Sequence, residues 1–346
     1  MIRVGIAGIG FMGMVHYLSY LKLRGVKVAA LCESNASRLK GDWRDIRGNF
    51  GPPGQMMDLS GIATYSNIDE MLADPSLDMI DVTLPPLLHA DIVIKAFQAG
   101  KHVFCEKPMA MTVRDCDRMM AAAKQAKKML FIGHVLPYFP EYAWALKVIQ
   151  GGKHGKLLGG SFRRVISEPT WLPNFWNADQ VGGPMLDLHI HDAHFIRLVF
   201  GKPISVICRG RMREGLPQFW HSQFDYGTNG PVVSATSGTI DQQARPFNHG
   251  FEIHLEKATL LFEFAILGGE GAYCPPPTLL VGGQTQHPAL PDGDPMNAFE
   301  GELQEVLKCV RKSERSQILD ASLARDAIVL CQKQSESLRR RCFVRM

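Results

Sequence analysis

Short apolar runs alternate with amphipathic stretches over the first 130 residues. The apolar runs predict strands, and the amphipathic stretches between them predict helices of about ten or more residues. Strands separated by such helices favour a parallel, doubly wound α/β sheet. Glycine and proline interrupt this alternation over residues 41–61, which we expect to form an inserted loop. The expected strands are 2–7, 27–32, 80–83, 102–105 and 129–133, and the expected helices are 12–24, 90–99 and 113–127, the last with Thr112 as its N-cap.

The pattern changes after residue 131, where longer alternating runs joined by glycine turns become frequent. These runs predict an α+β domain with a large, mainly antiparallel sheet. We expect irregular coil over residues 268–296, because glycine and proline are frequent there. The expected strands are 157–166, 204–212, 218–226, 232–240, 250–255 and 259–264, and the expected helices are 141–150, 191–200, 298–312 and 321–339.

The length of 346 residues favours two domains. We place the doubly wound α/β domain at residues 1–130 and the α+β domain at residues 131–346. The two closing helices can pack back on the first domain. The composition is that of a soluble globular protein, with 46% hydrophobic and 21% charged residues.

The charge pattern argues against nucleic-acid and membrane partners. The net charge is +4 and is scattered, apart from Arg339–Arg341 near the end of the chain. No apolar run reaches the length of a membrane span, and the first residues read as a strand rather than an export signal. Eight cysteines show no CxxC spacing. They therefore predict reduced, mostly buried thiols in a cytoplasmic protein.

A glycine-rich turn follows the first expected strand and opens the first expected helix. Its glycines permit a tight turn, close approach of a pyrophosphate, and packing of the helix on the sheet. Glu33 ends the second expected strand, where a carboxylate would bind the ribose hydroxyls of NAD and repel the extra phosphate of NADP. Arg38 can flank the adenine or tolerate that phosphate, so NAD is preferred and NADP stays possible. The turn reads Gly8-Ile9-Gly10-Phe11-Met12-Gly13.

The segment His102–Thr112 places Glu106, Lys107 and Pro108 where a short apolar strand should end. Burial or a nearby cation can lower the pKa of a lysine, which then becomes a usable proton donor or acceptor near neutral pH. Lys107 is therefore our candidate for chemistry. The Lys107–Pro108 bond is a candidate for the cis form.

Four segments of the sequence, 8–13, 83–89, 99–108 and 182–192, together resemble the glucose-fructose oxidoreductase / inositol dehydrogenase / rhizopine catabolism protein (Gfo/Idh/MocA) family. The resemblance covers essentially the whole chain. It implies that residues 1–130 form an NAD(P)-binding Rossmann domain and that residues 131–346, built on a large, mainly antiparallel sheet, form a substrate-binding and oligomerisation domain. It also implies NAD(P)-dependent oxidation or reduction of sugars, cyclitols and related polyols, by a homodimer or homotetramer.

The same resemblance implies roles for individual residues. Lys107 matches the active-site lysine, and Glu106 lies beside it near the nicotinamide. Asp187 and His191 match an aspartate and a histidine that face the substrate. The loop after the fourth strand, which lies along the cofactor, contains Thr83, Pro85 and His89.

The residues around Asp187 allow two arrangements. In a helix, Asp187, His191 and His194 share a face; in an extended chain, Asp187, His189 and His191 do. In both cases an aspartate meets a histidine, which could shuttle a hydroxyl proton. The imidazoles also suit Zn²⁺, but no further ligand cluster stands out and we expect no metal. His189 and His194 are expected to be structural more than functional.

Aromatic side chains before the Gly182-Gly183 turn suit the apolar face of a sugar ring. Trp171 and Trp176 are the candidates, and Phe175 lies between them. The alternative is a cluster that pins the loop to the core. Tyr138 is a candidate hydroxyl for the substrate pocket.

Three functions follow from these motifs. The main hypothesis is reversible hydride transfer between a secondary alcohol of a sugar or polyol and a nicotinamide, with Lys107 as base and His191, steadied by Asp187, sharing this role or fixing the substrate. The second is an NAD-dependent glycosidase that acts by transient oxidation and elimination. The third is a non-catalytic dinucleotide sensor, which would have no chemical need for Lys107, Asp187 and His191.

Overall fold

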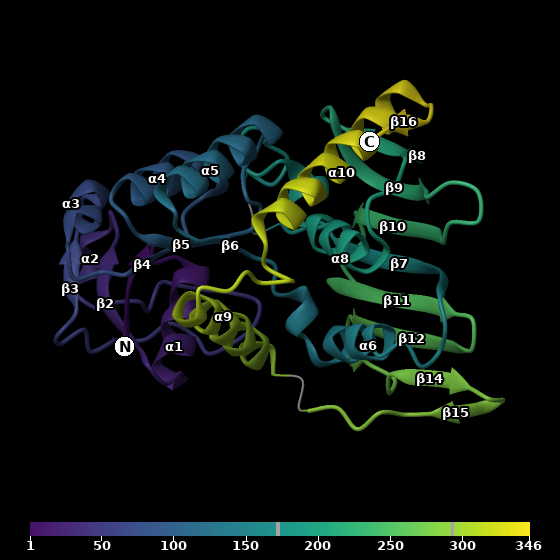
Figure 1. Cartoon of the computed structure of the whole chain (residues 1–346), viewed down its shortest axis with the longest axis horizontal. Coiled ribbons are helices and arrows are strands. Elements are labelled where there is room, and N and C mark those ends of the chain that lie inside the picture. Colours follow the sequence, from purple (N-terminus) through teal and green to yellow (C-terminus); the bar gives the residue numbers. More distant parts are fainter. Residues whose placement is uncertain (171–173, 292–293) are drawn as a thin grey trace. The chain divides into compact units, whose positions relative to one another are not determined.

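The computed structural model describes residues 1–170, 174–291 and 294–346. The chain forms two compact units, Met1–Phe139 with Gly293–Arg325, and Pro140–Asp292 with Asp326–Met346. Figure 1 shows both units with their elements labelled. The division of roles between domains 1–130 and 131–346 stays a prediction, because compactness does not assign a role.

The first unit contains a six-stranded sheet in the order β3-β2-β1-β4-β5-β6, and every neighbouring pair is parallel. The predicted doubly wound parallel sheet is therefore confirmed. The residues of β1 agree with the predicted 2–7. The strands are β1 (Ile2–Ala7), β2 (Val26–Cys32), β3 (Ala63–Tyr65), β4 (Met79–Val82), β5 (His102–Glu106) and β6 (Leu130–Gly133).

Helices connect these strands, and one further helix joins the unit from the end of the chain. Thr112 caps α5 as predicted, since its hydroxyl accepts the N–H of Asp115 at 3.1 Å. The sequence did not predict α2, β3 or α3, which are short. The helices are α1 (Phe11–Lys22), α2 (Ala36–Leu39), α3 (Ile68–Ala73), α4 (Pro86–Gln98), α5 (Val113–Ala126), the 3₁₀ turn η1 (Leu136–Tyr138) and α9 (Pro295–Lys312).

The inserted loop 41–61 is anchored by a buried tryptophan. Trp43 is fully buried, packs edge-on against Tyr17 of α1 and donates its indole N–H to the carbonyl of Arg38 at 2.9 Å. Asp42 and Met56 form an antiparallel bridge at the base of the loop. The loop is thus a built part of the unit, although it contains no helix or longer strand.

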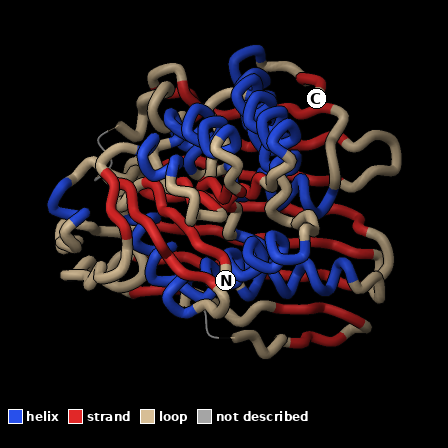
Figure 2. Tube along the Cα trace, turned by 60° about the vertical axis from the view of Figure 1, so that its left-hand side comes forward, coloured by secondary structure: helices blue, strands red, loops and turns tan. Residues whose placement is uncertain are grey.

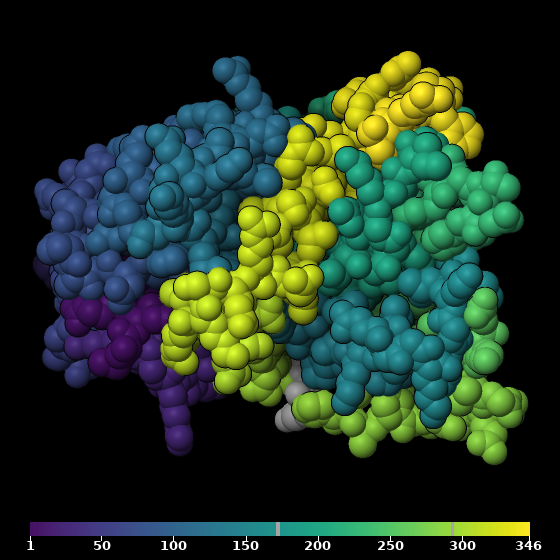
Figure 3. Space-filling view, in the orientation of Figure 1, coloured from purple at the N-terminus to yellow at the C-terminus, as the bar shows by residue number. Residues whose placement is uncertain are grey.

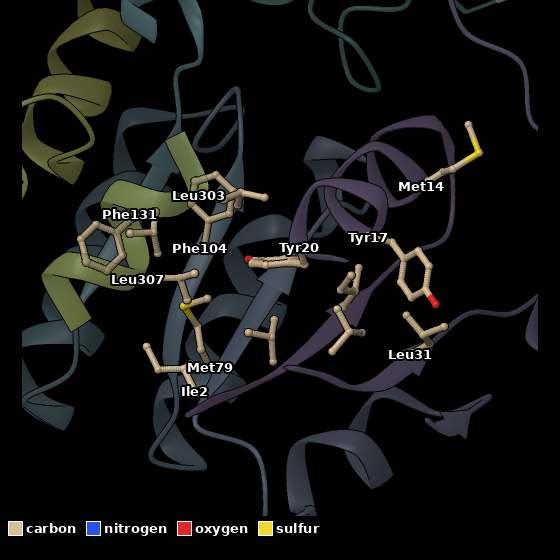
Figure 4. Close-up of a cluster of buried hydrophobic side chains, with 14 of the residues drawn as sticks. Ile2, Met14, Tyr17, Tyr20, Leu31, Met79, Phe104, Phe131, Leu303 and Leu307 are labelled. Carbon is tan, nitrogen blue, oxygen red and sulfur yellow. The ribbon is translucent and has the colours of Figure 1, made fainter. Parts of the chain in front are cut away.

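The core of the first unit combines strands of the sheet with α1 and α9. Leu303 and Leu307 of α9 pack with Ile2 of β1, Tyr20 of α1 and Phe131 of β6 in one buried cluster (Figure 4). The outer surface of α9 lies beside the purple N-terminal part of the same unit (Figure 3). Residues just over 300 positions apart, such as Ile2 and Leu303, therefore share one core.

The second unit is built on a ten-stranded sheet whose long strands run side by side (Figures 1 and 2). Its order is β15-β14-β12-β11-β7-β10-β9-β8-β16, with β13 beside β12. The pair β7–β10 is parallel and the other pairs are antiparallel, as the prediction of a mainly antiparallel sheet requires. Its strands are β7 (Leu157–Ser167), β8 (Ser205–Arg213), β9 (Leu216–Asp225), β10 (Val232–Ile240), β11 (Phe247–Leu255), β12 (Ala258–Leu267), β13 (Gly271–Tyr273), β14 (Thr278–Val281), β15 (Gln284–Gln286) and β16 (Val344–Arg345).

The expectation of irregular coil over residues 268–296 is wrong in part. The strands β13, β14 and β15 fall in this range and extend the sheet beyond β12. They are three or four residues long and separated by glycine and proline, so each is too short to give a pattern of its own. The helices of this unit are α6 (Pro140–Gln150), α7 (Gly183–Asp187), α8 (Ile190–Phe200) and α10 (Ala321–Arg340), the last from Asp326 onward.

Two general expectations can be compared with the structure. All eight cysteines are free, and six of them are buried. Among the described residues, no helix combines the length and the apolar character needed to cross a membrane.

Leu303→Ala tests whether α9 is an integral part of the first unit. Leu303 is fully buried, so truncation should lower the free energy of unfolding by about 2–5 kcal/mol. Chemical denaturation followed by circular dichroism measures this loss. Lys308→Ala, at an exposed position of the same helix, is the control and should change it by less than about 0.5 kcal/mol. Equal effects of the two substitutions would contradict the packing described here.

Candidate functional site

The turn between β1 and α1 is held by the three glycines of the motif, each for a different reason. Gly8 has a φ of +97°, a conformation that other residues rarely adopt. A Cβ atom on Gly13 would collide with the carbonyl oxygen of Gly8, so only glycine permits this approach of helix to strand. A Cβ atom on Gly10 would meet nothing within 4 Å, which leaves open space in front of the turn.

The start of α1 faces this space with uncapped backbone groups. Gly10 occupies the N-cap position and provides no side-chain hydrogen bond to the N–H groups of the first turn. Free N–H groups and the positive end of the helix dipole make such a terminus suitable for a phosphate group. The residues present therefore fit the pyrophosphate of a dinucleotide, as the motif predicts.

Glu33 lies directly after β2 and is bound by the turn itself. Its Oε2 accepts the N–H of Ile9 at 2.8 Å, and its Oε1 accepts the N–H groups of Ser34 and Asn35 at 2.8 and 3.0 Å. Burial alone would raise the pKa of Glu33, but these hydrogen bonds outweigh it and lower the pKa. Glu33 is thus an ionised carboxylate fixed beside the glycine turn, where a ribose diol would need an acceptor.

Arg38 contacts the same turn, with its Nη1 4.0 Å from Oε2 of Glu33. Its Nη1 donates to the carbonyl of Ile9 at 3.0 Å, while its Nη2 and Nε donate to Oδ2 of Asp45 at 2.6 and 3.2 Å. Asp45 belongs to the inserted loop, which sequence reasoning did not connect with the cofactor. Because Asp45 engages the guanidinium, Arg38 is less available to a phosphate on the ribose.

Thr83 and Phe11 complete the surroundings of the turn. The hydroxyl of Thr83 donates to the carbonyl of Gly8 at 2.7 Å and so links the end of β4 to the turn. The ring of Phe11 packs edge-on against Phe50, with centroids 4.8 Å apart, and against Gly48. The side chain of Phe11 thus faces the inserted loop.

Met12 packs against a second apolar cluster of the unit, which includes Val15 and Phe299. Phe11 and Met12 were predicted to bind the cofactor. Their side chains are engaged in packing, so their backbone N–H groups at the start of α1 are the atoms suited to that role.

The loop after β4 is tied to the Lys107 segment by a histidine. His89 is fully buried, with Nδ1 2.9 Å from the carbonyl oxygen of Pro108 and Nε2 2.7 Å from that of Leu84. Burial lowers its pKa. Pro85 is exposed at the start of α4. His89 therefore joins two loops at the carboxyl ends of β4 and β5.

Lys107 follows β5 directly and is half-buried. Its bond to Pro108 is cis, which confirms the prediction. Its backbone N–H donates to Oε2 of Glu106 at 3.0 Å. Since β1 and β5 both flank β4 in a parallel sheet, Lys107 and the glycine turn lie at the same edge of the sheet.

Sequence reasoning missed a buried ionic cluster beside this segment. The ring of His16 on α1 lies between two carboxylates, with Nδ1 3.0 Å from Oδ2 of Asp81 and Nε2 3.1 Å from Oε1 of Glu106. Burial alone would lower the pKa of His16, but attraction and hydrogen bonds from both carboxylates raise it to about 10. His16 is therefore an imidazolium. The sequence contained one signal for this position: His16 follows Gly13 by three residues, so both lie on the helix face that packs on the sheet.

Tyr138 was predicted to offer a hydroxyl to the substrate. In the structure it lies in η1, packed against the core of the first unit. Burial, followed by the negative charges of Glu305 and Glu302 on α9, raises its pKa. A role in substrate binding stays a prediction.

In the second unit, residues 187–194 are mainly helical and not extended, but they belong to two separate helices. Asp187 is the last residue of α7, and His191 and His194 lie one turn apart in α8. His189 stands between the helices, fully buried, with Nδ1 2.7 Å from the hydroxyl of Ser237. Burial lowers the pKa of His189 to about 4, so it is neutral, in line with a structural role.

A buried ion pair fixes α8 on the sheet. Arg164 of β7 donates from Nε to Oδ2 of Asp192 at 2.6 Å and from Nη2 to Oδ1 at 3.0 Å, and both side chains are almost fully buried. Asp192 follows His191 directly. The pair thus sets the position of the helix that carries His191. The side chains of His191 and Asp187 are both half-buried.

Trp176 and Phe175 differ in their surroundings. Phe175 is buried, as expected of a residue that pins a loop to the core. Trp176 is half-buried, donates its indole N–H to Glu168 at 2.7 Å, and is covered on one face by Arg213 at 4.7 Å from the ring centroid. Trp171 lies outside the described residues.

The part of the chain that the structure describes contains no group of three or more potential metal ligands suited to hold an ion.

Comparison with protein families matches both parts of the chain. Residues 2–134 match the family described as "Oxidoreductase family, NAD-binding Rossmann fold", and residues 142–261 match the Gfo/Idh/MocA C-terminal domain. Together the two matches cover well over half of the chain.

Curated relatives are similar at low identity. Myo-inositol 2-dehydrogenase of Thermotoga maritima is 26% identical over 206 residues, which cover 59% of this chain and 57% of the relative. The 2,7-anhydro-N-acetylneuraminate hydratase of Escherichia coli is 28% identical over 201 residues, which cover 51% and 54%. The chain thus spans a little over half the length of these relatives.

Solved structures share the fold over almost the whole chain. The complex of levoglucosan dehydrogenase with NADH and L-sorbose superposes with a TM-score of 0.80, at 18% identity, and covers 99% of this chain and 98% of that one.

Asp45→Ala tests whether the inserted loop controls cofactor choice. Loss of the Asp45 carboxylate should free Arg38 and tighten NADP binding by about 3- to 10-fold, with little change for NAD, because Glu33 is unchanged. Titration calorimetry with both dinucleotides measures this. Asp42→Ala is a matched control, since Asp42 pairs with exposed Arg44 in the same loop. Equal changes for both dinucleotides would contradict the assignment.

His16 should also give the fold a defined pH dependence. Its pKa is raised from 6.5 to about 10 on folding, so its contribution is complete below pH 6.5 and is lost as pH rises to about 10. In this window the free energy of unfolding should fall by up to about 1.4 kcal/mol per pH unit. Urea denaturation at several pH values measures it. His16→Gln should lack this slope, and parallel curves for the two proteins would contradict the charge assigned to His16.

Proposed function

Because the chain belongs to the Gfo/Idh/MocA family of NAD-binding oxidoreductases, we propose that it transfers hydride between a secondary alcohol of a sugar, cyclitol or related polyol and a nicotinamide cofactor. NAD is the preferred cofactor and NADP the weaker one. The relatives support this class of substrate by their names: one is a dehydrogenase of myo-inositol, and a structural neighbour is a levoglucosan dehydrogenase with NADH and L-sorbose.

One observation carries the proposal. The glycine turn that fits a pyrophosphate and the half-buried Lys107 lie at the same edge of one parallel sheet, at the ends of β1 and β5 on either side of β4. In doubly wound folds ligands bind at the carboxyl ends of the strands, where the strand order reverses. A dinucleotide held at the turn can therefore extend along this edge towards Lys107.

Lys107 is the proposed proton acceptor during oxidation. When bound, a nicotinamide supplies the carbon that accepts or returns the hydride. Loss of hydride from an alcohol carbon requires removal of the hydroxyl proton, so a base must lie within about 3 Å of that oxygen. Lys107 in its neutral form has the required lone pair. In the reverse direction, protonated Lys107 returns the proton to the forming hydroxyl.

Asp187 and His191 are proposed to recognise substrate hydroxyls, with His191 also able to move a proton. The buried pair of Arg164 and Asp192 supports this assignment, because it holds the helix of His191 in place. Trp176 has one face covered by Arg213. Its other face is the proposed platform for a sugar ring.

A second candidate function uses the same groups without net oxidation. One relative is named a hydratase, an enzyme class that adds or removes water. By analogy, this chain would oxidise a ring hydroxyl transiently, eliminate a leaving group and return the hydride, as in the glycosidase hypothesis. The cofactor would then be regenerated in each turnover.

A panel of sugars, cyclitols and their glycosides with NAD and NADP separates the two candidates. Accumulation of reduced nicotinamide, read by its absorbance, selects the oxidoreductase. Release of a leaving group or water without such accumulation, read by product mass, selects the second function. Tight NAD binding with neither reaction would favour a dinucleotide sensor and contradict both.

The oligomeric state remains part of the proposal. A homodimer or homotetramer is what the family resemblance implies, and light scattering of the purified protein measures it directly.

Lys107→Met should remove turnover while sparing cofactor binding. General acid–base catalysis contributes about 10²- to 10⁴-fold, so kcat should fall by that factor. NADH affinity, followed by fluorescence, should stay within about threefold, because the glycine turn and Glu33 are unchanged. Lys95→Met is the control, since Lys95 lies at the surface in a pair with Asp69. Retained turnover in Lys107→Met would reject the role of Lys107.

A further inference from the structure

His16 is fully buried in the first unit and touches two acidic side chains from different strands. Nδ1 lies 3.1 and 3.0 Å from the two carboxylate oxygens of Asp81 on β4, and Nε2 lies 3.1 Å from Oε1 of Glu106 on β5. The rings of Phe104 and Phe299 lie close by, with centroids 5.4 and 6.1 Å away. The imidazole is thus held by carboxylates at both nitrogens and surrounded by apolar rings.

This geometry sets the protonation of the ring. An ionised carboxylate only accepts hydrogen bonds, so a ring between two of them is satisfied when both nitrogens donate. The raised pKa of His16 agrees with this imidazolium form. His16 therefore compensates the charges of Asp81 and Glu106 in a place from which water is excluded.

Glu106 passes this constraint on to Lys107. Its Oε1 faces His16, and its Oε2 accepts the backbone N–H of Lys107 at 3.0 Å. The two oxygens belong to one rigid, planar group. A shift of the hydrogen bond to His16 therefore also shifts the hydrogen bond to the N–H of Lys107. The backbone at Lys107 is thus coupled to the His16 ring on α1.

Other ionisable groups near the cluster lie on α1, α4, β5 and α9. Burial lowers the pKa of His89 on α4 and raises that of Cys105 on β5, and the charge of Glu106 acts on both. Glu302 of α9 is fully buried, and burial followed by the charge of Glu106 raises its pKa well above the usual range. Tyr20 of α1 is also buried, and burial followed by the charge of Asp81 raises its pKa. The acidic groups in direct contact with the His16 ring are thus Asp81 and Glu106.

We propose that His16 is a positioning residue, which holds the Glu106 carboxylate against the N–H of Lys107 and thereby sets the orientation of the backbone that carries the catalytic lysine. The inference rests on the proposed function where it calls Lys107 catalytic. The coupling between His16 and the Lys107 backbone does not depend on that function.

A double-mutant cycle tests the coupling in catalysis. His16→Gln keeps one hydrogen bond but removes the charge, and should lower kcat by about 10²-fold, as a small misplacement of a catalytic group does. It should also shift the pH profile of kcat, while NADH affinity stays within about threefold. In the Glu106→Gln background the same substitution should change kcat by less than about threefold, because residues in one network do not act additively.

Ser19→Ala is the matched control on the same helix. Ser19 is fully buried, and its hydroxyl donates to the carbonyl of Val15, one turn earlier in the same helix. The control should keep kcat and its pH profile. If His16→Gln lowers kcat by the same factor in the wild-type and the Glu106→Gln backgrounds, the proposal is overturned, because the histidine would then act independently of the carboxylate.

Nuclear magnetic resonance tests the same coupling without turnover. In protein labelled with ¹⁵N-lysine and ¹⁵N-histidine, His16 should show two protonated ring nitrogens up to about pH 9. The substitution His16→Gln should change the chemical shift of the Lys107 backbone amide. The signal of that amide is assigned by its loss in Lys107→Met. An unmoved Lys107 signal, or a neutral His16 ring at pH 7, overturns the proposal. If the wild-type protein turns over no sugar or polyol, the proposed function fails and these signals still decide the coupling.

Discussion

The close approach of α1 to the end of β1 is the constraint on which the first unit depends. Gly13 permits it because any side chain there would collide with the carbonyl of Gly8. The same approach carries His16, three residues further on the same face of the helix, into the space between β4 and β5. One packing contact therefore creates both an open helix terminus suited to phosphate and a cation beneath the sheet edge.

Two carboxylates at strand ends accept backbone N–H groups of the loops at the carboxyl ends of the strands. Glu33 after β2 accepts the N–H of Ile9, and Glu106 at the end of β5 accepts the N–H of Lys107. Each acid is thus bonded to a loop that the cofactor or the substrate would contact. Such hydrogen bonds between protein groups limit how far the two loops can reorganise, and preorganised polar groups are usually the largest single source of catalytic stabilisation in enzymes.

Local patterns in the sequence predicted much of the fold and of the loops at the sheet edge. The strand before the glycine turn, the Thr112 cap and the cis bond at Lys107 all have signals within a few residues. The partners of His16 are 65 and 90 residues away, and the bond from Asp45 to Arg38 crosses an insertion. Such contacts depend on tertiary packing, which periodicity and spacing do not report.

The first unit is also discontinuous along the chain, since α9 joins its core after more than 150 residues of the second unit. Domains that fold during synthesis generally do so as they leave the ribosome. Here the nascent sheet lacks Leu303 and Leu307 until translation is nearly complete. The order of segments therefore makes completion of this core wait for the synthesis of α9, after most of the second unit has left the ribosome.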